Sequence, residues 1–361
     1  MWTYANPVRV EFGAGALSRI AAAIGGRRWA LVTYDLSAFK AKAAEIASAA
    51  GKPVVSIDNI VANPDFADLV DSCWRFAEAA SAPEVIVALG GGSIIDAAKV
   101  LAASEGSFDT VRDHLTTKTP LNARRITPII AVPSTAGTGS EVTSWATVWD
   151  SANGAKYSLA HPALYPEVAI VDPALALGAP QALTLATGLD ALSHALESIW
   201  NVSANPVSAT FAVEAAREVL AVLPALMQDL TNLDLRSRQA RAATFAGLAF
   251  SNTRTALAHN ISYDLTLKQG TPHGIACSFC LPMVMGWSIG SDPVCDANLR
   301  KIFGDNLHAA ADTLRSFIEG LGISTEPSAY GLNSKEWRML VERAMAGERG
   351  RNFIGRAELA A

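Results

Sequence analysis

Short apolar runs alternate with longer stretches of helical spacing through the first third of the chain. Four runs have the length and composition of buried β-strands: WALVTY, PVVSI, EVIVALG and TPIIAVP. Three stretches between them carry apolar residues three and four positions apart, as amphipathic helices do: AKAAEIASAA, DLVDSCWRFAEAA and SIIDAAKVLAA. This alternation predicts an α/β fold, with a parallel sheet that has helices on both faces.

The pattern changes in the middle of the chain. Two strands of a hairpin are predicted from TSWATVWD and GAKYSLAH, with the turn at DSANGA, and EVAIVDP predicts a return strand. From Gln181 onward the apolar residues keep helical spacing, and Pro206 suits the first position of a helix. A chain of 361 residues is also longer than the chains that usually fold around a single hydrophobic core. We therefore expect an α/β dinucleotide-binding domain at residues 1–178 and an all-α metal-binding domain at residues 179–361.

Composition and charge narrow the class of protein. A formal net charge of −5 and the lack of any basic run argue against nucleic acid as a partner. Charged residues interrupt every apolar stretch before it reaches membrane-spanning length, and the N-terminus has no signal-peptide pattern. Four cysteines are few for this length, which favours a reducing compartment. We expect a cytoplasmic protein that acts on a small molecule and does not bind a membrane.

Two of the cysteines form the motif CSFC, at Cys277 and Cys280. No second CxxC accompanies it, and its neighbours are apolar. The motif therefore predicts two buried core thiols rather than a zinc or redox site.

Two glycine-rich turns follow predicted strands. In EVIVALGGGSIIDAAK, the residues Gly90, Gly91, Gly92 and Ser93 lie between a buried strand and a helix, so bare backbone could approach a pyrophosphate at a helix N-terminus. The motif is not GxGxxG, and a tight connection alone would also explain the glycines. The second turn, PSTAGTGSEVTS, offers small hydroxyl side chains as further lining for a nucleotide, namely Thr135, Thr138 and Ser140.

Asp35 directly follows WALVTY, the first predicted strand. A carboxylate in that position accepts hydrogen bonds from ribose hydroxyls and repels a 2′-phosphate, which favours NAD(H) over NADP(H). The alternative is that Asp35 caps the helix that begins near Ser37.

A set of histidines and one aspartate predicts a metal site in the second half. Asp190 and His194 are four residues apart in a helical stretch, so their side chains share one face. His259 and His273 follow within a short span, the second next to a glycine. Taken singly, each of these four residues is common in a hydrophobic core or a loop and does not indicate a metal. Together, one carboxylate and three neutral imidazoles give a divalent cation four ligands and leave it a strong Lewis acid.

With GGGSIIDAAK, STAGTGSEVT and these metal-ligand pairs in this order, the chain resembles the iron-containing (group III) alcohol dehydrogenases over nearly its whole length. The resemblance implies an N-terminal nucleotide-binding domain, a helical C-terminal domain, and NAD(P) and a divalent metal meeting in the cleft between them. It also implies a homodimer, metal ligation by the aspartate and three histidines, and dinucleotide binding by the two glycine-rich turns. Fe²⁺ is the metal expected from the family, although imidazole-rich sites also accept Zn²⁺, Mn²⁺ or Ni²⁺.

One position departs from the family pattern. Many members carry a further histidine four residues after the third ligand, where this chain has Tyr263. The route of the proton is therefore open: the tyrosine hydroxyl could donate it, or water and the cofactor ribose could replace it. Lys156, on the predicted hairpin, is a second catalytic candidate, the alternative being a solvated charge at a strand end.

Three further stretches look more specifically like the phosphonate-associated branch of the family, which includes phosphonoacetaldehyde reductases: GLDALSHALESIWNVSANPVS, HNISYDLTLKQGTPHG and RGRNFIG. A phosphonate substrate needs cations or helix N-termini near the metal, and the candidates are Lys156, Arg254, Lys268 and Arg351, with Arg254 ranked first. The expected reaction is reduction of phosphonoacetaldehyde to 2-hydroxyethylphosphonate with NAD(P)H.

Several other functions are compatible with the same sequence features. Another short-chain alcohol dehydrogenase or a maleylacetate reductase would carry the same motifs. A lyase similar to dehydroquinate synthase would be expected to bind its metal with Glu and two His, against which the Asp and three His argue. A non-catalytic metal- or nucleotide-binding protein is the remaining class.

Overall fold

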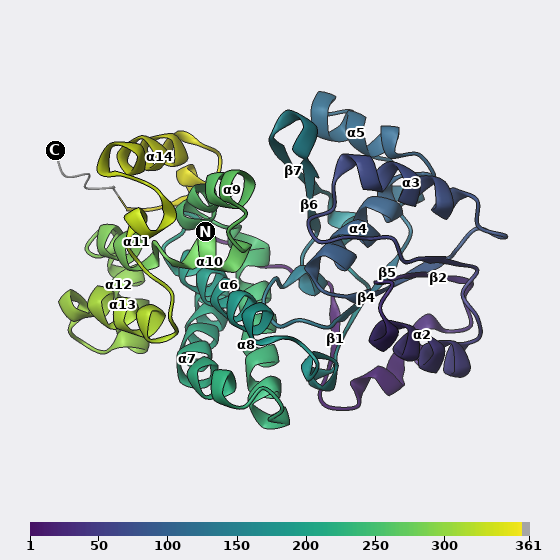
Figure 1. Ribbon diagram of the computed structural model, residues 1–361, viewed down its shortest axis with the longest axis horizontal. Helices are drawn as coiled ribbons and strands as arrows, with labels where there is room; N and C mark the ends of the chain where they lie inside the picture. Colours follow the sequence, from purple (N-terminus) through teal and green to yellow (C-terminus); the bar gives the residue numbers. More distant parts are fainter. Residues whose placement is uncertain (356–361) are drawn as a thin grey trace. The chain divides into compact units, whose positions relative to one another are not determined.

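The computed structural model describes residues 1–355, which fold as two compact units (Figure 1). The α/β unit comprises Asn6–Thr135 and Ser140–Gly178. The helical unit takes Ala179 onward and also two segments from the first half of the chain, Met1–Ala5 and Ala136–Gly139. The second turn of the sequence, PSTAGTGSEVTS, is therefore divided between the units, a division that local sequence spacing does not predict.

The α/β unit is built on one six-stranded parallel sheet, in the order β1-β8-β5-β4-β2-β3. Its strands are β1 (Arg9–Phe12), β2 (Trp29–Val32), β3 (Val55–Ile57), β4 (Val85–Gly90), β5 (Ile129–Pro133) and β8 (Val168–Val171). The helices between them are α1 (Ile20–Ile24), α2 (Ser37–Ala50), α3 (Phe66–Ala77), α4 (Gly92–Ala103) and α5 (Phe108–Thr117). The predicted parallel α/β sheet is confirmed, and its parallel strands place the loops after β2, β4 and β5 at one edge.

Both faces of this sheet are buried. Along β4, Ile86 and Ala88 belong to a core shared with α3, α4 and α5, whereas Val85, Val87 and Leu89 belong to a core shared with α1 and α2. Successive side chains of a strand point to opposite faces, so a strand buried on both sides needs apolar residues at every position. This is why the sequences of these strands are apolar at successive positions rather than at every second one.

The hairpin predicted in the middle of the chain is also present, as β6 (Trp145–Asp150) and β7 (Ala155–Ala160). Its turn contains Gly154 at φ 60°, a left-handed conformation that glycine adopts without steric cost. Asp150 accepts hydrogen bonds from Asn153 within the turn.

The helical unit is arranged around one buried helix, α6. Its helices are α6 (Gln181–Ile199), α7 (Pro206–Gln228), α8 (Leu233–Thr253), α9 (Leu257–Gln269), α10 (His273–Ser278), α11 (Leu281–Ser288), α12 (Pro293–Phe303), α13 (Ala310–Gly320) and α14 (Ser334–Ala346). Pro206 opens α7 as predicted, behind the capping residue Asn205. Every residue of α6 from Gly188 to Ile199 is buried, with α7, α8 and α10 packed against the helix. Polar residues in that stretch must therefore find their partners inside the protein.

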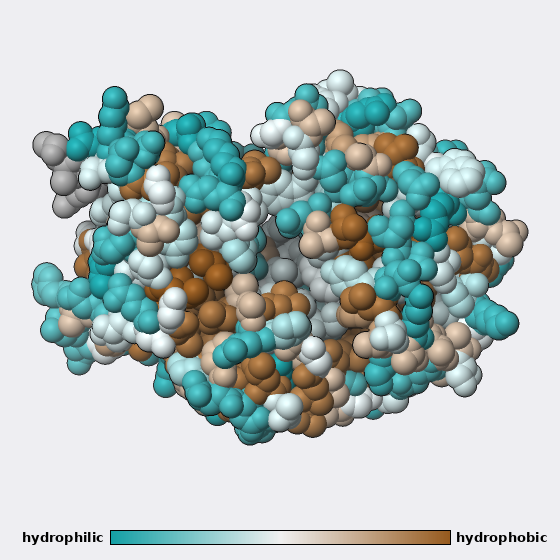
Figure 2. All heavy atoms as spheres, in the orientation of Figure 1, coloured by the Kyte–Doolittle hydropathy of each residue, from teal (hydrophilic) through white to brown (hydrophobic). Residues whose placement is uncertain are grey.

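Among residues 1–355, no helix is both long enough and apolar enough to cross a membrane. Large exposed apolar side chains are scattered along the sequence, for example at Trp2, Leu36, Trp74 and Val294. The face drawn in Figure 2 shows apolar residues mixed with polar ones.

Candidate metal centre and nucleotide site

Helix α6 contributes three buried polar side chains to one of its faces. Asp190, His194 and Glu197 occupy positions i, i+4 and i+7, which align along one side of an α-helix. They are 4%, 5% and 0% exposed. This face is the first half of the site.

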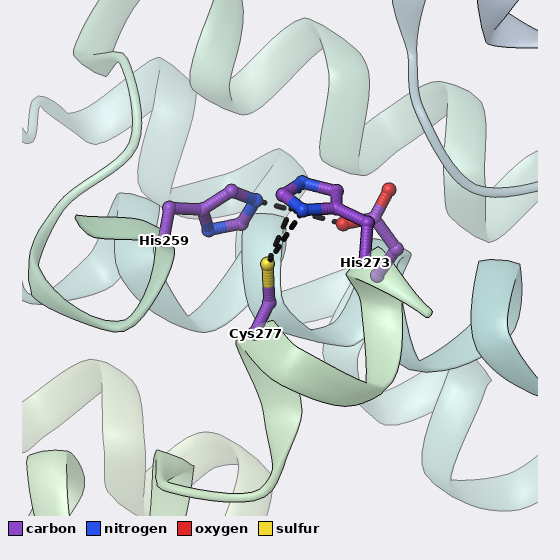
Figure 3. Close-up of side chains that lie close together, drawn as sticks. His259, His273 and Cys277 are labelled. Atoms are coloured by element: carbon purple, nitrogen blue, oxygen red, sulfur yellow. Dashed lines mark hydrogen bonds and ion pairs between the residues drawn. The ribbon is translucent and has the colours of Figure 1, made fainter. Parts of the chain in front are cut away.

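The second half comes from α9 and α10. His259 lies in the first turn of α9, His273 is the first residue of α10, and Cys277 follows one turn later. Figure 3 shows the two imidazole rings and the Cys277 sulfur directed toward one another. The structure thus gathers the predicted ligands in one place and adds a thiol to them.

The distances within this group suit ligands of one cation. Oδ1 of Asp190 lies 3.5 Å from Nε2 of His259 and 3.8 Å from Nε2 of His194. One atom each of Asp190, His259, His273 and Cys277 all lie within 4.8 Å of one another. A tetrahedral centre with bonds of about 2.0–2.3 Å would separate its ligand atoms by roughly 3.3–3.8 Å.

Two imidazole rings are oriented by hydrogen bonds on their far side. Nδ1 of His259 lies 2.7 Å from Oε2 of Glu197, and Nδ1 of His194 lies 3.3 Å from the Gly137 carbonyl oxygen. Each acceptor holds the proton on Nδ1 and leaves Nε2 with a bare lone pair. Such outer partners are a regular feature of metal-binding histidines.

Nε2 of His259 and Oδ1 of Asp190 face each other at 3.5 Å, with no hydrogen-bond partner among the described residues. Oδ1 of Asp190 and Nε2 of His259 are buried and accept no hydrogen bond from the described residues. Two lone pairs in contact inside a protein are unfavourable unless positive charge lies between them. The residues present therefore fit a divalent cation.

The electrostatics of the group point the same way. Burial favours neutral side chains, yet the nearby imidazoles keep the pKa of the Asp190 carboxyl below its ordinary value. Burial also opposes charge on His259, but Cys277, Glu197 and Asp190 together raise its pKa well above the ordinary value. His194 behaves differently, since burial lowers its pKa to about 4 despite Asp190 and keeps the ring neutral near pH 7. The buried side chains thus attract positive charge at the point where His259 meets Asp190.

Glycine at position 274 is required by close packing of α10 on α6. A Cβ atom on Gly274 would lie 1.8 Å from the Ala186 carbonyl oxygen and 3.0 Å from Cβ of Asp190. The absence of a side chain lets His273 approach the aspartate from the neighbouring helix. The glycine beside His273 therefore has a packing role that bears on the site.

Two residues of this site were not predicted as functional. Glu197 lies seven residues after Asp190 and three after His194, on the same helix face, so this spacing could have indicated it. Cys277 was expected to be a core thiol. It is buried, but its sulfur lies with the metal-ligand candidates, whereas Cys280 lies outside that group.

Tyr263 lies on α9 one turn after His259 and is half-buried. Residues four apart share a helix face, so the tyrosine and the histidine project to the same side of α9.

Three of the cations considered for the substrate, Arg254, Lys268 and Arg351, belong to the helical unit and lie in different surroundings. Arg254 follows α8 with a positive φ of 64°, is exposed, and forms an ion pair with Glu348. Its carbonyl accepts a hydrogen bond from Asn201, which also bridges to Phe353, so Arg254 and the segment of Arg351 meet at one place. Lys268 instead pairs with Asp264, about 13 Å along the axis of α9 from His259.

In the α/β unit, the first glycine turn joins β4 to α4. The capping residue Gly91 has no side chain to bond the first N–H groups of α4, and its carbonyl accepts from Ile94 and Ile95 further along, so an anion could accept from the N–H groups that precede them. A Cβ atom on Gly90 would lie 2.4 Å from Ile94, so packing also requires that glycine. The hydroxyl of Ser93 accepts a hydrogen bond from the Asn63 N–H.

The other cofactor candidates are dispersed. Asp35 is exposed and pairs with Lys40, and it is not the capping residue of α2, which is Leu36. Thr135 belongs to the α/β unit and Thr138 to the helical unit. The Ser140 hydroxyl is buried in the interior, where it donates to Asp96 at 2.5 Å and accepts from the Lys99 ammonium at 2.8 Å.

Lys156, the second catalytic candidate, lies on β7. Its ammonium is 5.8 Å from the centre of the Trp149 ring, within the range of a cation–π interaction. Its positive charge also helps to lower the pKa of Asp96, although burial has the larger effect and raises that pKa overall.

Comparison with known proteins covers both units. Residues 7–173 match the family described as iron-containing alcohol dehydrogenase, and residues 184–354 match the C-terminal region of the Fe-containing alcohol dehydrogenase family. The chain is 32% identical over 304 residues to sulfoacetaldehyde reductase of Bilophila wadsworthia, covering 80% of this chain and 77% of that protein. It is 32% identical over 318 residues to 1,3-propanediol dehydrogenase of Klebsiella pneumoniae, covering 85% and 80%.

A solved structure is similar over almost the full length. Sulfoacetaldehyde reductase from Bifidobacterium kashiwanohense, in complex with NAD⁺, is 30% identical with a TM-score of 0.89, covering 99% of this chain and 94% of that chain.

Proposed function

The chain belongs to the iron-containing alcohol dehydrogenase family of oxidoreductases, and we propose that it reduces a small anionic aldehyde with NADH at a divalent metal centre. The observation that carries this proposal is the buried pair Asp190 and His259, whose facing oxygen and nitrogen have no hydrogen-bond partner among the described residues. We assign Asp190, His194, His259 and His273 as ligands and Fe²⁺ as the metal, with Zn²⁺, Mn²⁺ and Ni²⁺ as the alternatives that imidazole ligands accept.

A bound cation supplies a Lewis acid for the carbonyl oxygen, and NADH supplies the hydride. The chain's own contribution begins with orientation: Glu197 and the Gly137 carbonyl hold two imidazoles with Nε2 toward the centre. We assign Tyr263, which shares a helix face with His259, as the group that returns a proton to the product oxygen. Lys156 is assigned to the reacting end of the cofactor.

For the cofactor, we assign the pyrophosphate to Gly90, Gly91, Gly92 and Ser93 at the start of α4, where the helix dipole and uncapped N–H groups favour an anion. Thr135 is assigned to the same ligand, and Ser140 supports it from the interior through Asp96. The Asp35 carboxylate, exposed beyond β2, favours NAD(H) over NADP(H) because it would repel a 2′-phosphate.

For the substrate, two independent considerations favour an anionic group next to the aldehyde. Similarity to sulfoacetaldehyde reductases indicates a sulfonate, and the motifs around both metal-ligand pairs indicate a phosphonate. We propose phosphonoacetaldehyde, reduced to 2-hydroxyethylphosphonate, with Arg254 and Arg351 as its anion contacts. An uncharged short-chain aldehyde or maleylacetate is the alternative substrate.

The test is NADH consumption, followed by absorbance, with metal-loaded protein and three aldehydes: phosphonoacetaldehyde, sulfoacetaldehyde and propanal. A charge-assisted contact should give an anionic substrate at least ~10-fold higher kcat/KM than propanal. Arg254→Ala and Arg351→Ala should reduce kcat/KM for the anionic substrates and leave that for propanal unchanged. Equal use of all three aldehydes would refute the anionic substrate, and no oxidation with any of them would refute the reductase.

The metal centre has its own test. His273→Ala should lose both bound metal and most turnover while keeping its fold, since one ligand of four is removed. His308→Ala, which changes an exposed histidine, is the matched control and should keep both. Normal turnover and metal content in the His273 variant would overturn the ligand assignment.

We also propose that the enzyme acts as a homodimer in the cytoplasm. The location is supported by four unpaired cysteines, all buried. Light scattering of the purified protein would decide the oligomeric state, and a monomeric mass would refute the dimer.

A further inference from the structure

We propose that Cys277 binds the metal through its sulfur, so that a thiolate joins the carboxylate and imidazoles of the centre. This inference rests on the proposed metal site and deepens it. Sγ of Cys277 is 3.5 Å from Nε2 and 3.7 Å from Nδ1 of His273. The sulfur also completes the compact group formed with Asp190 and His259, in which the ligand atoms all lie within 4.8 Å of one another.

A hydrogen bond between thiol and imidazole does not account for this contact. The lone pair of a ring nitrogen lies in the ring plane and points away from the other nitrogen, so an in-line donor is close to one nitrogen only. The sulfur is almost equally far from both nitrogens of His273. A cation shared by the sulfur and a re-oriented ring nitrogen would satisfy both groups, and edges of roughly 3.5–3.8 Å suit such a pair.

Local structure keeps the sulfur at this place. Cys277 lies four residues after His273 on α10, so both side chains project from the same side of that short helix (Figure 3). The cysteine is fully buried, and the close packing of Gly274 against Ala186 holds α10 on α6. His194 lies beside this group: its Nε2 is 3.8 Å from Oδ1 of Asp190, and its ring stacks on His259 at 4.6 Å and on Phe250 at 4.0 Å.

The consequence concerns which metal is bound. When the sulfur–metal bond forms, the thiol proton passes to the solvent, and the thiolate adds a second negative charge to that of Asp190. Soft sulfur favours zinc and cobalt over manganese, which prefers oxygen ligands. We therefore expect stronger discrimination against Mn²⁺ than an aspartate and three histidines would give.

The experiment replaces the metal with Co²⁺ in the intact protein and records its absorption spectrum. Ligation by Cys277 gives a near-ultraviolet thiolate-to-cobalt charge-transfer band in the wild type, which Cys277→Ser removes. Cys280→Ser is the matched control, because this equally buried thiol lies three residues away and outside the group, and its variant should keep the band.

Two other outcomes have distinct meanings. Visible cobalt bands without the charge-transfer band would overturn the role of Cys277 and leave the metal site standing. No cobalt binding at all would overturn both the site and this inference. Should Cys277→Ser fail to fold, X-ray absorption of the zinc-loaded wild type decides, with one sulfur at about 2.3 Å expected and nitrogen or oxygen neighbours alone contradicting the proposal.

Discussion

Oε2 of Glu197 lies 2.7 Å from Nδ1 of His259, and both side chains are buried. The other carboxylate oxygen, Oε1, accepts hydrogen bonds from the N–H groups of Ala258 and His259 at 2.5 and 3.2 Å. One carboxylate therefore fixes both the ring and the start of α9. It sets the tautomer of His259 and increases the basicity of the nitrogen that faces Asp190.

Glu197→Gln is expected to weaken metal binding by roughly 10- to 100-fold, the usual effect of losing such an outer partner. The amide carries no charge, and its NH₂ group would face backbone N–H donors. Metal dissociation constants measured against a chelator of known affinity would test this. Glu218→Gln, which changes an acid paired with Arg238 and Arg241, is the control. Equal affinities in both variants would mean that Glu197 has only a structural role.

Gly274→Ala should release the metal without removing any ligand. Its Cβ would lie 1.8 Å from the Ala186 carbonyl oxygen, so α10 must move away from α6 and carry His273 with it. Overpacking of this kind costs about 1–3 kcal/mol in the free energy of unfolding. Metal content by elemental analysis and urea unfolding measure the two effects.

Gly286→Ala is the matched control for that variant. Gly286 is also helical, and a Cβ there meets no atom within 4 Å. The change should leave metal content unchanged and stabilise α11 by up to about 1 kcal/mol. If Gly274→Ala kept its full metal content as well, close packing of α10 would not control the site.

Asp35→Ser should shift the coenzyme preference toward NADPH. The exposed carboxylate would repel a 2′-phosphate, whereas serine leaves room and can donate a hydrogen bond to it. The ratio of kcat/KM for NADPH to that for NADH should rise by on the order of 10-fold. Asp113→Ser, on the exposed side of α5, controls for a general change of surface charge. An unchanged ratio would show that Asp35 does not lie against the ribose.

Glu141→Gln should stabilise the protein near neutral pH. Burial raises the pKa of Glu141 to about 6, and the attraction of Lys99 offsets only part of that effect. Because the folded state holds this proton more tightly than the unfolded state, stability falls as pH rises from about 4.5 to 6. The ionised carboxylate then costs roughly 2 kcal/mol above that window.

The variant's gain in the free energy of unfolding should thus be present at about pH 7 and nearly absent at about pH 4.5. Urea unfolding at both pH values measures it, with Glu78→Gln on the exposed surface as the control. A gain of the same size at both pH values would contradict a cost that arises from ionisation.

The sequence by itself determined the local structure and the chemistry that one helix face can carry. Continuous apolar runs predicted strands buried on both faces, the DSANGA turn predicted the β6–β7 hairpin, and the ordered motifs predicted the family. The spacing of Asp190 and His194 predicted a shared helix face, because residues four apart align in any α-helix. Each of these conclusions depends on neighbours that are close along the chain.

Only the tertiary structure decided which of those faces meet. Packing of α9 and α10 on α6 aims Glu197 at His259 and places Cys277, expected to be a core thiol, among the candidate metal ligands. In the same way, the Ser140 hydroxyl, expected to line a nucleotide, is directed into the interior toward Asp96 and Lys99. The physical reason is that side-chain direction along a helix or strand repeats with a fixed local period, whereas the partner opposite is chosen by long-range packing of the whole unit.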